Sequence, residues 1–251
     1  MLNSIRRWMS PDAAIPGAAA VKAWARAAGH TVHRLREAGG HEGVVVTPRA
    51  DAPRWRLEWG TPQRSYFQAC ELRMRGELGV QANLQMLLIT AALMQRLEKQ
   101  VFEQYTEDLQ THIDAQTPEE VRWLVLLRKL SGSHLGALRE SFTVVGNLPA
   151  ALSRWMSPDL LAALNAARQS WLDDATDLTA VVQNRRMTMR MAMGEANPER
   201  LSAAVALFET VLREARTVAE QFASAQADGG TSTIPSLWSR SVAEPVEPPA
   251  P

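Results

Sequence analysis

The sequence predicts an α+β protein in which an antiparallel sheet packs against long helices. Three observations lead to this class: short segments with alternating apolar and charged residues before residue 80, long apolar stripes at helical spacing, and a strand pair followed by a helix near the C-terminus. The chain has 251 residues and 46% hydrophobic content, which is enough apolar material for a packed core.

The first elements are a helix over residues 18–28, which ends at a glycine, and a strand pair over 32–37 and 42–47. Residues 54–59 and 66–78 then alternate as strands. Trp55, Leu57 and Trp59 share one face of this second pair, whereas its other face carries charges of both signs. The turn predicts that Arg54 lies opposite Glu71, and paired, solvated charges are the simplest interpretation of the second face.

Helices are predicted to follow this sheet. Residues 83–113 carry apolar side chains at helical spacing and predict one long helix. Thr117-Pro118-Glu119-Glu120 is typical of a helix start, and the next helix is expected to continue to Leu130. Residues 133–145 predict a further short helix.

The hexapeptide Arg-Trp-Met-Ser-Pro-Asp occurs twice, at Arg7–Asp12 and at Arg154–Asp159. The second copy precedes a predicted helix over 160–171, a hairpin over 178–182 and 187–193, a glycine, and a long helix starting near Pro198. The first half is predicted to have the same order of elements. We therefore expect a degenerate duplication, in which Trp8 and Trp155 occupy comparable packing positions.

These patterns divide the chain into five predicted parts. They are an N-terminal segment (1–16), an α+β unit (17–115), a mainly helical connector (116–153), a smaller second α+β unit (154–224) and a disordered tail (225–251). The tail is rich in Gly, Ser and Pro, and such segments bury too little apolar surface to offset the entropy lost on ordering.

Composition excludes several classes of protein. Lys plus Arg and Asp plus Glu both number 27, so the chain is not a generally basic, histone-like protein. Cys70 is the single cysteine, which rules out an intrachain disulfide and a cysteine-based zinc site. The longest apolar stretch, Leu84–Met94, is too short to span a membrane. Abundant Arg and Ala indicate a GC-rich bacterial genome, and we expect a cytoplasmic protein.

The sequence motifs indicate no catalytic, cofactor-binding or metal-ligating residue. His30 and His33 have opposite parity on a strand, and His41 completes no known ligand spacing. Four alternating methionines at 187, 189, 191 and 193 are a set of thioethers suited to Cu(I), but a core face explains them more simply. Ser131-Gly132-Ser133-His134 places its hydroxyls and imidazole on adjacent residues, which do not face each other on a helix.

The sequence therefore favours a non-enzymatic protein that acts through contact with an unidentified protein partner. Ile234, Leu237 and Trp238 form an apolar island in the polar tail and are candidate partner-binding residues. A less favoured alternative is a nucleic-acid-binding protein that uses a basic sheet face made of Arg54, Arg56, Arg73 and Arg75. A second alternative is an enzyme whose site is formed by residues distant in the sequence. The oligomeric state stays open.

Overall fold

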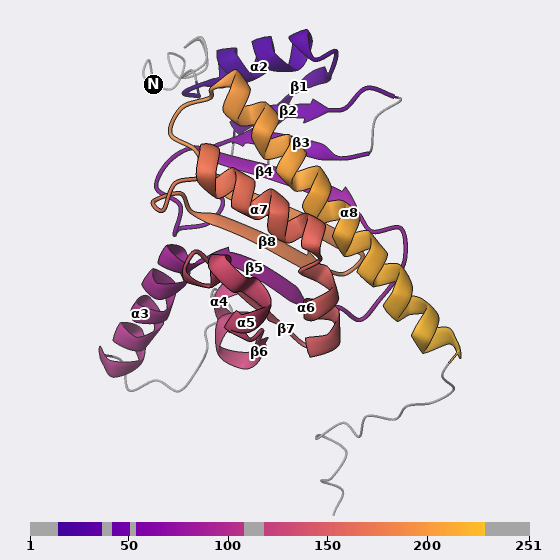
Figure 1. The fold of residues 1–251 in the computed structure, drawn as a ribbon. Coiled ribbons are helices and arrows are strands. Elements are labelled where there is room, and N and C mark those ends of the chain that lie inside the picture. Colours follow the sequence, from indigo (N-terminus) through magenta and orange to yellow (C-terminus); the bar gives the residue numbers. More distant parts are fainter. Residues whose placement is uncertain (1–14, 37–41, 51–53, 108–117, 229–251) are drawn as a thin grey trace, which may run out of the picture.

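The computed structural model describes residues 15–36, 42–50, 54–107 and 118–228. Within them, nine strands form one antiparallel sheet in the order β1-β2-β3-β4-β9-β8-β5-β7-β6, and helices lie on both of its faces (Figure 1). This confirms the predicted α+β class. The elements are α2 (Ala18–Ala27), β1 (Thr31–Arg36), β2 (Glu42–Thr47), β3 (Arg56–Gly60), β4 (Glu71–Glu77), β5 (Met86–Thr90), α3 (Ala91–Glu107), α4 (Glu119–Leu126), β6 (Arg128–Lys129), α5 (Gly132–Leu135), the 3₁₀ helix η1 (Gly136–Glu140), β7 (Phe142–Gly146), α6 (Pro149–Trp155), α7 (Pro158–Ser170), β8 (Leu178–Gln183), β9 (Arg186–Ala192) and α8 (Pro198–Asp228).

The first four strands form an antiparallel meander, which contains both predicted strand pairs and joins them through β2 and β3. In it, Leu57 pairs with Met74 and Trp59 with Leu72, and all four side chains are fully buried on one face. Strand β4 begins at Glu71 and not at residue 66. The register also differs from the prediction, because Gly60 lies opposite Glu71, whereas Arg54 precedes β3.

The β8–β9 hairpin is inserted into the same sheet, where β9 pairs with β4 and β8 pairs with β5. Asn184 and Arg185 both have positive φ, which suits the two-residue turn that joins these strands. The hairpin itself is as predicted. It does not form a separate sheet, since it links the two parts of a single sheet.

The predicted long helix over 83–113 is wrong in its first part. Residues 86–90 form strand β5, and the helix α3 begins only at Ala91. All five residues of β5 are buried between β8 and β7. A strand buried on both faces has a continuous apolar run, which single-sequence periodicity does not distinguish from a buried helix.

The predicted helix over 133–145 is also wrong. A single turn, α5, and the 3₁₀ helix η1 occupy residues 132–140, and Phe142–Gly146 forms the buried strand β7. Strand β7 contains Thr143, Val144 and Val145, whose branched side chains favour extended backbone. Its pairing with β5 therefore overrides the weak helical pattern.

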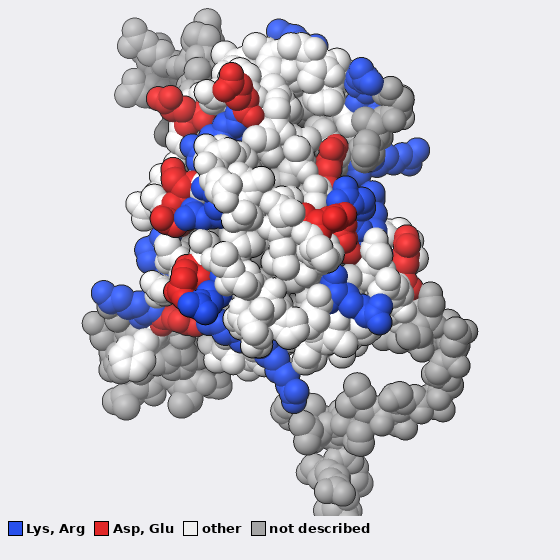
Figure 2. Space-filling model, viewed as in Figure 1, with Lys and Arg blue, Asp and Glu red and all other residues white. Residues whose placement is uncertain are grey.

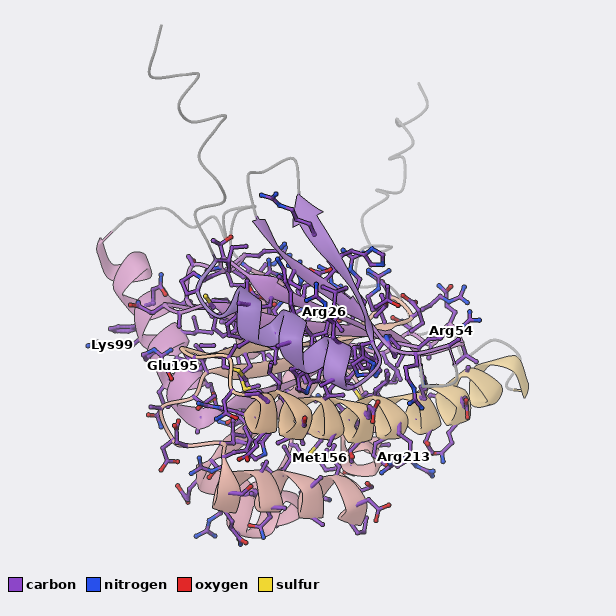
Figure 3. All side chains as sticks on the ribbon, turned by 90° about the horizontal axis from the view of Figure 1, so that it is seen from above. Arg26, Arg54, Lys99, Met156, Glu195 and Arg213 are labelled. Carbon is purple, nitrogen blue, oxygen red and sulfur yellow. The ribbon has the colours of Figure 1, made fainter. Side chains whose placement is uncertain are left out.

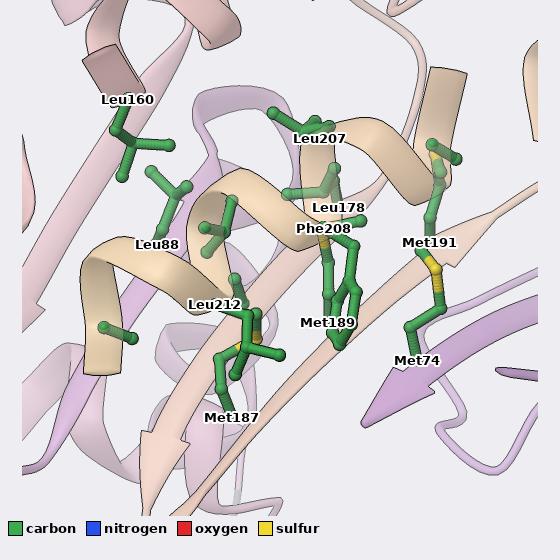
Figure 4. Close-up of a cluster of buried hydrophobic side chains, with 14 of the residues drawn as sticks. Met74, Leu88, Leu160, Leu178, Met187, Met189, Met191, Leu207, Phe208 and Leu212 are labelled. Carbon is green, nitrogen blue, oxygen red and sulfur yellow. The ribbon is translucent and has the colours of Figure 1, made fainter. Parts of the chain in front are cut away.

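The main core lies between one face of the sheet and the helices α2, α6, α7 and α8. Seen from above, α8 runs between α2 and α7, and it contacts both (Figure 3). The alternating methionines of β9 face this layer. Met187, Met189 and Met191 are fully buried near Phe208 and Leu212 of α8 (Figure 4).

The second copy of the hexapeptide ends α6 and starts α7. Ser157 accepts a hydrogen bond from the backbone N–H of Leu160 at 3.2 Å, Pro158 occupies the first turn, and Asp159 faces the helix N-terminus. Trp155 is fully buried, and its indole N–H donates to the Val211 carbonyl at 3.4 Å. Trp8 lies outside the described residues, so its predicted equivalence to Trp155 is untested. The predicted order of strand, glycine and helix fits β9, Gly194 and α8, but β5 interrupts it after Gly79.

Candidate functional site

A row of polar side chains crosses the second face of the sheet. The register aligns Glu58 of β3 with Arg73 of β4, Arg190 of β9 and Thr179 of β8. Glu58 and Arg73 are each 3% exposed, Arg190 is 7% exposed and Thr179 is fully buried. The interpretation of this face as a solvated ladder of charges is therefore wrong at its centre.

Arginines of the predicted basic face surround the carboxylate of Glu58. It forms an ion pair with Arg73, and its Oε1 lies 2.6 Å from Arg56 Nε and 4.0 Å from Arg75 Nη1. The Arg56 and Arg75 side chains remain 46% and 32% exposed. The structure thus brings three of the four predicted arginines together around one buried glutamate. Arg54 is exposed and lies outside this group.

A second group of buried charges joins the sheet to α4 and to the loop before β4. Arg190 forms an ion pair with Glu71 and lies 4.0 Å from Glu120, which also pairs with Arg64 at 3.2 Å. Glu71 accepts a hydrogen bond from the Gln63 backbone N–H at 2.6 Å. Burial, and then the nearby Glu120 carboxylate, raise the pKa of Tyr66 above its usual value. These buried charges are compensated by their partners and hold the loop on the sheet.

A polar cavity of about 510 Å³ opens at the end of the sheet where β9 finishes and β8 begins. The loop before β4, helix α3, the loop between α7 and β8, the end of β9 and the first turn of α8 all contribute to its wall. Its lining residues are Gln68, Ala69, Arg96, Asp173, Ala175, Thr176, Asp177, Ala192, Gly194 and Arg200. The volume falls within the usual range of small-molecule sites, about 300–1,000 Å³.

Asp177 is the most deeply buried charged residue of the cavity wall, with 7% exposure. Arg96 Nη2 donates to Asp177 Oδ2 at 2.6 Å, whereas Asp177 Oδ1 is buried without a hydrogen-bond partner. The backbone on both sides of Asp177 is held in place. Its carbonyl accepts from the Ala192 N–H at 2.9 Å, and the next N–H, of Leu178, donates to Thr90 Oγ1 at 3.3 Å.

Thr176 links the remaining charged groups of the cavity. Its hydroxyl donates to Asp173 Oδ1 at 2.5 Å and accepts from Arg200 Nη2 at 3.0 Å. The Nε of Arg200 is buried without a hydrogen-bond partner. The wall therefore contains two arginines and two aspartates, a combination of charged groups that suits a polar ligand.

Sequence reasoning missed this cavity because its residues come from five separate segments. Arg96 and Asp177 are 81 positions apart and belong to no linear motif. The available signal in the sequence was the polar run Asp173-Asp174-Ala175-Thr176-Asp177, which precedes a predicted strand. Its pair of adjacent aspartates is equally typical of a helix end, so the run alone did not indicate a site.

None of the other candidate residues that the structure describes is part of the cavity lining. His30 lies between the rings of Trp24 and Trp55, and His33 is exposed on the edge strand β1. Burial raises the pKa of the Cys70 thiol, which lowers its reactivity. Ser131 and Ser133 share a hydroxyl–hydroxyl contact of 2.9 Å. His41, Ile234, Leu237 and Trp238 lie outside the described residues.

Within residues 15–36, 42–50, 54–107 and 118–228, no group of three or more His, Cys, Asp or Glu residues is arranged to hold a metal ion. None of the helices placed by the structure combines the length and the apolar character that crossing a membrane requires. On the face formed by α7 and α8, the middle is largely uncharged and both signs of charge mix along the margins (Figure 2).

Comparison with known proteins adds little to this description. No protein family matches the chain, and no curated protein matches it. Among solved structures, the chain is similar to the crystal structure of the mycobacterial trehalose monomycolate transport factor A, with a TM-score of 0.44 and 10% sequence identity. That match covers 78% of this chain and 90% of the other. Similarity at this level does not indicate a function.

Proposed function

We propose that this chain is a non-enzymatic bacterial cytoplasmic protein that acts by binding a protein partner. The observation that carries this proposal is the exposure of three large apolar side chains on two helices that contact each other. Phe102 of α3 is 69% exposed, and Val125 and Leu126 of α4 are 60% and 67% exposed.

Exposed side chains of this kind favour association, because removing them from water contributes roughly 25 cal/mol per Å² of apolar surface. Arg128 and Lys129 of the edge strand β6 follow directly after α4 and are exposed. Apolar groups beside flexible charges are typical of the centre and rim of a protein interface. The tail residues Ile234, Leu237 and Trp238 are a second predicted contact element, as a short apolar peptide.

Substitution of the three apolar residues tests this surface. The triple variant Phe102→Ser, Val125→Ser, Leu126→Ser is expected to lose its partners in a crosslinking pull-down from the source cells, while its circular dichroism spectrum stays unchanged because the side chains are exposed. Ala162→Ser, at an exposed position of α7, is the matched control. An unchanged list of partners for the triple variant would contradict a role for this surface.

The tail needs a separate comparison. A chain ending at Ala223 is expected to lose a subset of the partners captured by the full-length protein, since it lacks Ile234, Leu237 and Trp238. Identical lists for the two chains would discard the tail as a binding element.

The nucleic-acid alternative has less support. Arg73 is buried beside Glu58, and Arg56 and Arg75 point toward the same carboxylate, so phosphate groups would compete with an internal anion for these guanidinium groups. Binding to single-stranded RNA that weakens steeply with salt would favour this alternative. Absence of binding at low salt would remove it.

A further inference from the structure

The polar cavity at the end of the sheet has features of a ligand-binding site, and these do not depend on the proposed partner surface. Its charged lining consists of Arg96, Arg200, Asp173 and Asp177, so its formal charge is zero. Glu195, the neighbour of Gly194 in the lining, lies at the same end of the molecule as Lys99 of α3, whereas Arg54 lies at the opposite end (Figure 3). The cavity and Arg54 of the predicted basic face therefore lie at opposite ends of the molecule.

Two residues of this wall each have one buried polar atom without a hydrogen-bond partner, and the two atoms have opposite character. Asp177 Oδ1 is an anionic acceptor, and Arg200 Nε is a cationic donor. Because buried polar groups without hydrogen bonds destabilise a protein, these two residues are candidates for contact with a polar ligand. Such a ligand must offer both a donor and an acceptor.

Arg96 is positioned to control access to Asp177. The Arg96 side chain is 51% exposed while it pairs with Asp177 Oδ2 at 2.6 Å, whereas the side chain of Asp177 is 9% exposed. A partly exposed ion pair of this kind contributes little stability, so its opening costs little free energy. When Arg96 turns outward, Asp177 Oδ2 becomes available to a ligand cation, and Arg96 itself becomes available to a ligand anion.

We propose that this cavity binds a small zwitterion of the free amino-acid type, with its ammonium group on Asp177 and its carboxylate between Arg96 and Arg200. A zwitterion preserves the neutral balance of the lining, whereas a ligand with one net charge leaves either an aspartate or an arginine uncompensated. The volume of about 510 Å³ leaves room for a side chain beyond the two charged groups.

The test measures binding of free L-amino acids, one at a time, to the full-length protein by calorimetry at up to about 10 mM. At least one is expected to bind. Its methyl ester, which keeps only the cation, and its N-acetyl derivative, which keeps only the anion, are each expected to bind about tenfold more weakly or not at all. If the ester or the N-acetyl derivative binds as tightly as the parent amino acid, the proposal is overturned. It is also overturned if none of the free amino acids binds.

Two variants connect the binding to the cavity. Asp177→Asn keeps the shape of the side chain and removes the charge, and it is expected to weaken binding at least about tenfold. Asp174→Asn is the matched control, because that side chain is 88% exposed in the same loop and does not line the cavity. If Asp177→Asn fails to fold, Arg200→Gln provides the second measurement, with the same expected loss. Unchanged affinity in a folded Asp177→Asn or Arg200→Gln variant overturns the assignment.

Discussion

His30 illustrates how tertiary surroundings alter a single side chain. Its ring packs edge-on against Trp24, at a centroid distance of 5.5 Å, and against Trp55, at 5.3 Å. The two indole N–H groups are held elsewhere, because Trp24 donates to Ser202 and Trp55 donates to Glu209 of α8. Burial, and then the positive charge of Arg49, lower the pKa of His30 below its usual value of 6.5, against the opposing effect of Glu209.

This lowered pKa gives a pH dependence of stability. Below pH 6.5 the unfolded chain binds a proton at His30 more readily than the folded protein does, so the free energy of unfolding falls as the pH decreases through this range. We expect His30→Gln to flatten this decrease, as measured by urea denaturation at several pH values. An equal slope for His30→Gln and the unmodified protein would contradict the prediction.

Among the elements, strand β9 has buried methionines on one face of the sheet and a buried, ion-paired arginine on the other. Its odd-numbered methionines enter the core beneath α8, whereas Arg190 points to the second face and pairs with Glu71. The alternation in the sequence predicted this division, and it also predicted that the methionine stripe is packing. The burial of Arg190 did not follow from the sequence, because the partners that compensate its charge are Glu71 and Glu120, 119 and 70 positions away.

The buried methionines of β9 are expected to stabilise the protein by filling the core beneath α8. Met189→Ala is expected to lower the free energy of unfolding by about 2–5 kcal/mol, because it leaves a cavity beneath Phe208 and Leu212. Met189→Leu nearly conserves the volume, and its cost should stay below about 1.5 kcal/mol. Chemical denaturation of both variants checks this. A leucine variant as unstable as the alanine variant would show that the thioether does more than fill space.

At the scale of the whole molecule, the sheet order makes the two parts of the chain interdependent. Strands β4 and β5 are consecutive in sequence, yet β9 and β8 lie between them. Their side chains also share one core with α8, which spans residues 198–228. The predicted first α+β unit, residues 17–115, therefore lacks the strands and the helix that complete its own core.

A fragment of residues 1–115 tests this interdependence. We expect it not to unfold cooperatively on heating, because β4 loses its β9 partner and the core face loses α8. Thermal melting followed by circular dichroism, with the full-length protein alongside, measures this. A cooperative transition of the fragment near that of the full chain would contradict the prediction and would support the division of the chain at residue 115.

The sequence by itself determined the α+β class, the β1–β2 and β3–β4 strand pairs, the β8–β9 hairpin, the helix after the second hexapeptide and the apolar face of α8. Each of these depends on local periodicity or on turn and capping chemistry, which neighbouring residues encode. Only the tertiary structure decided that residues 86–90 and 142–146 are strands, that Glu58, Arg73 and Arg190 are buried, and that Arg96, Asp177 and Arg200 line one cavity. The reason is physical: strand pairing and the compensation of buried charge join residues far apart in the chain, and no local pattern records which of them will meet.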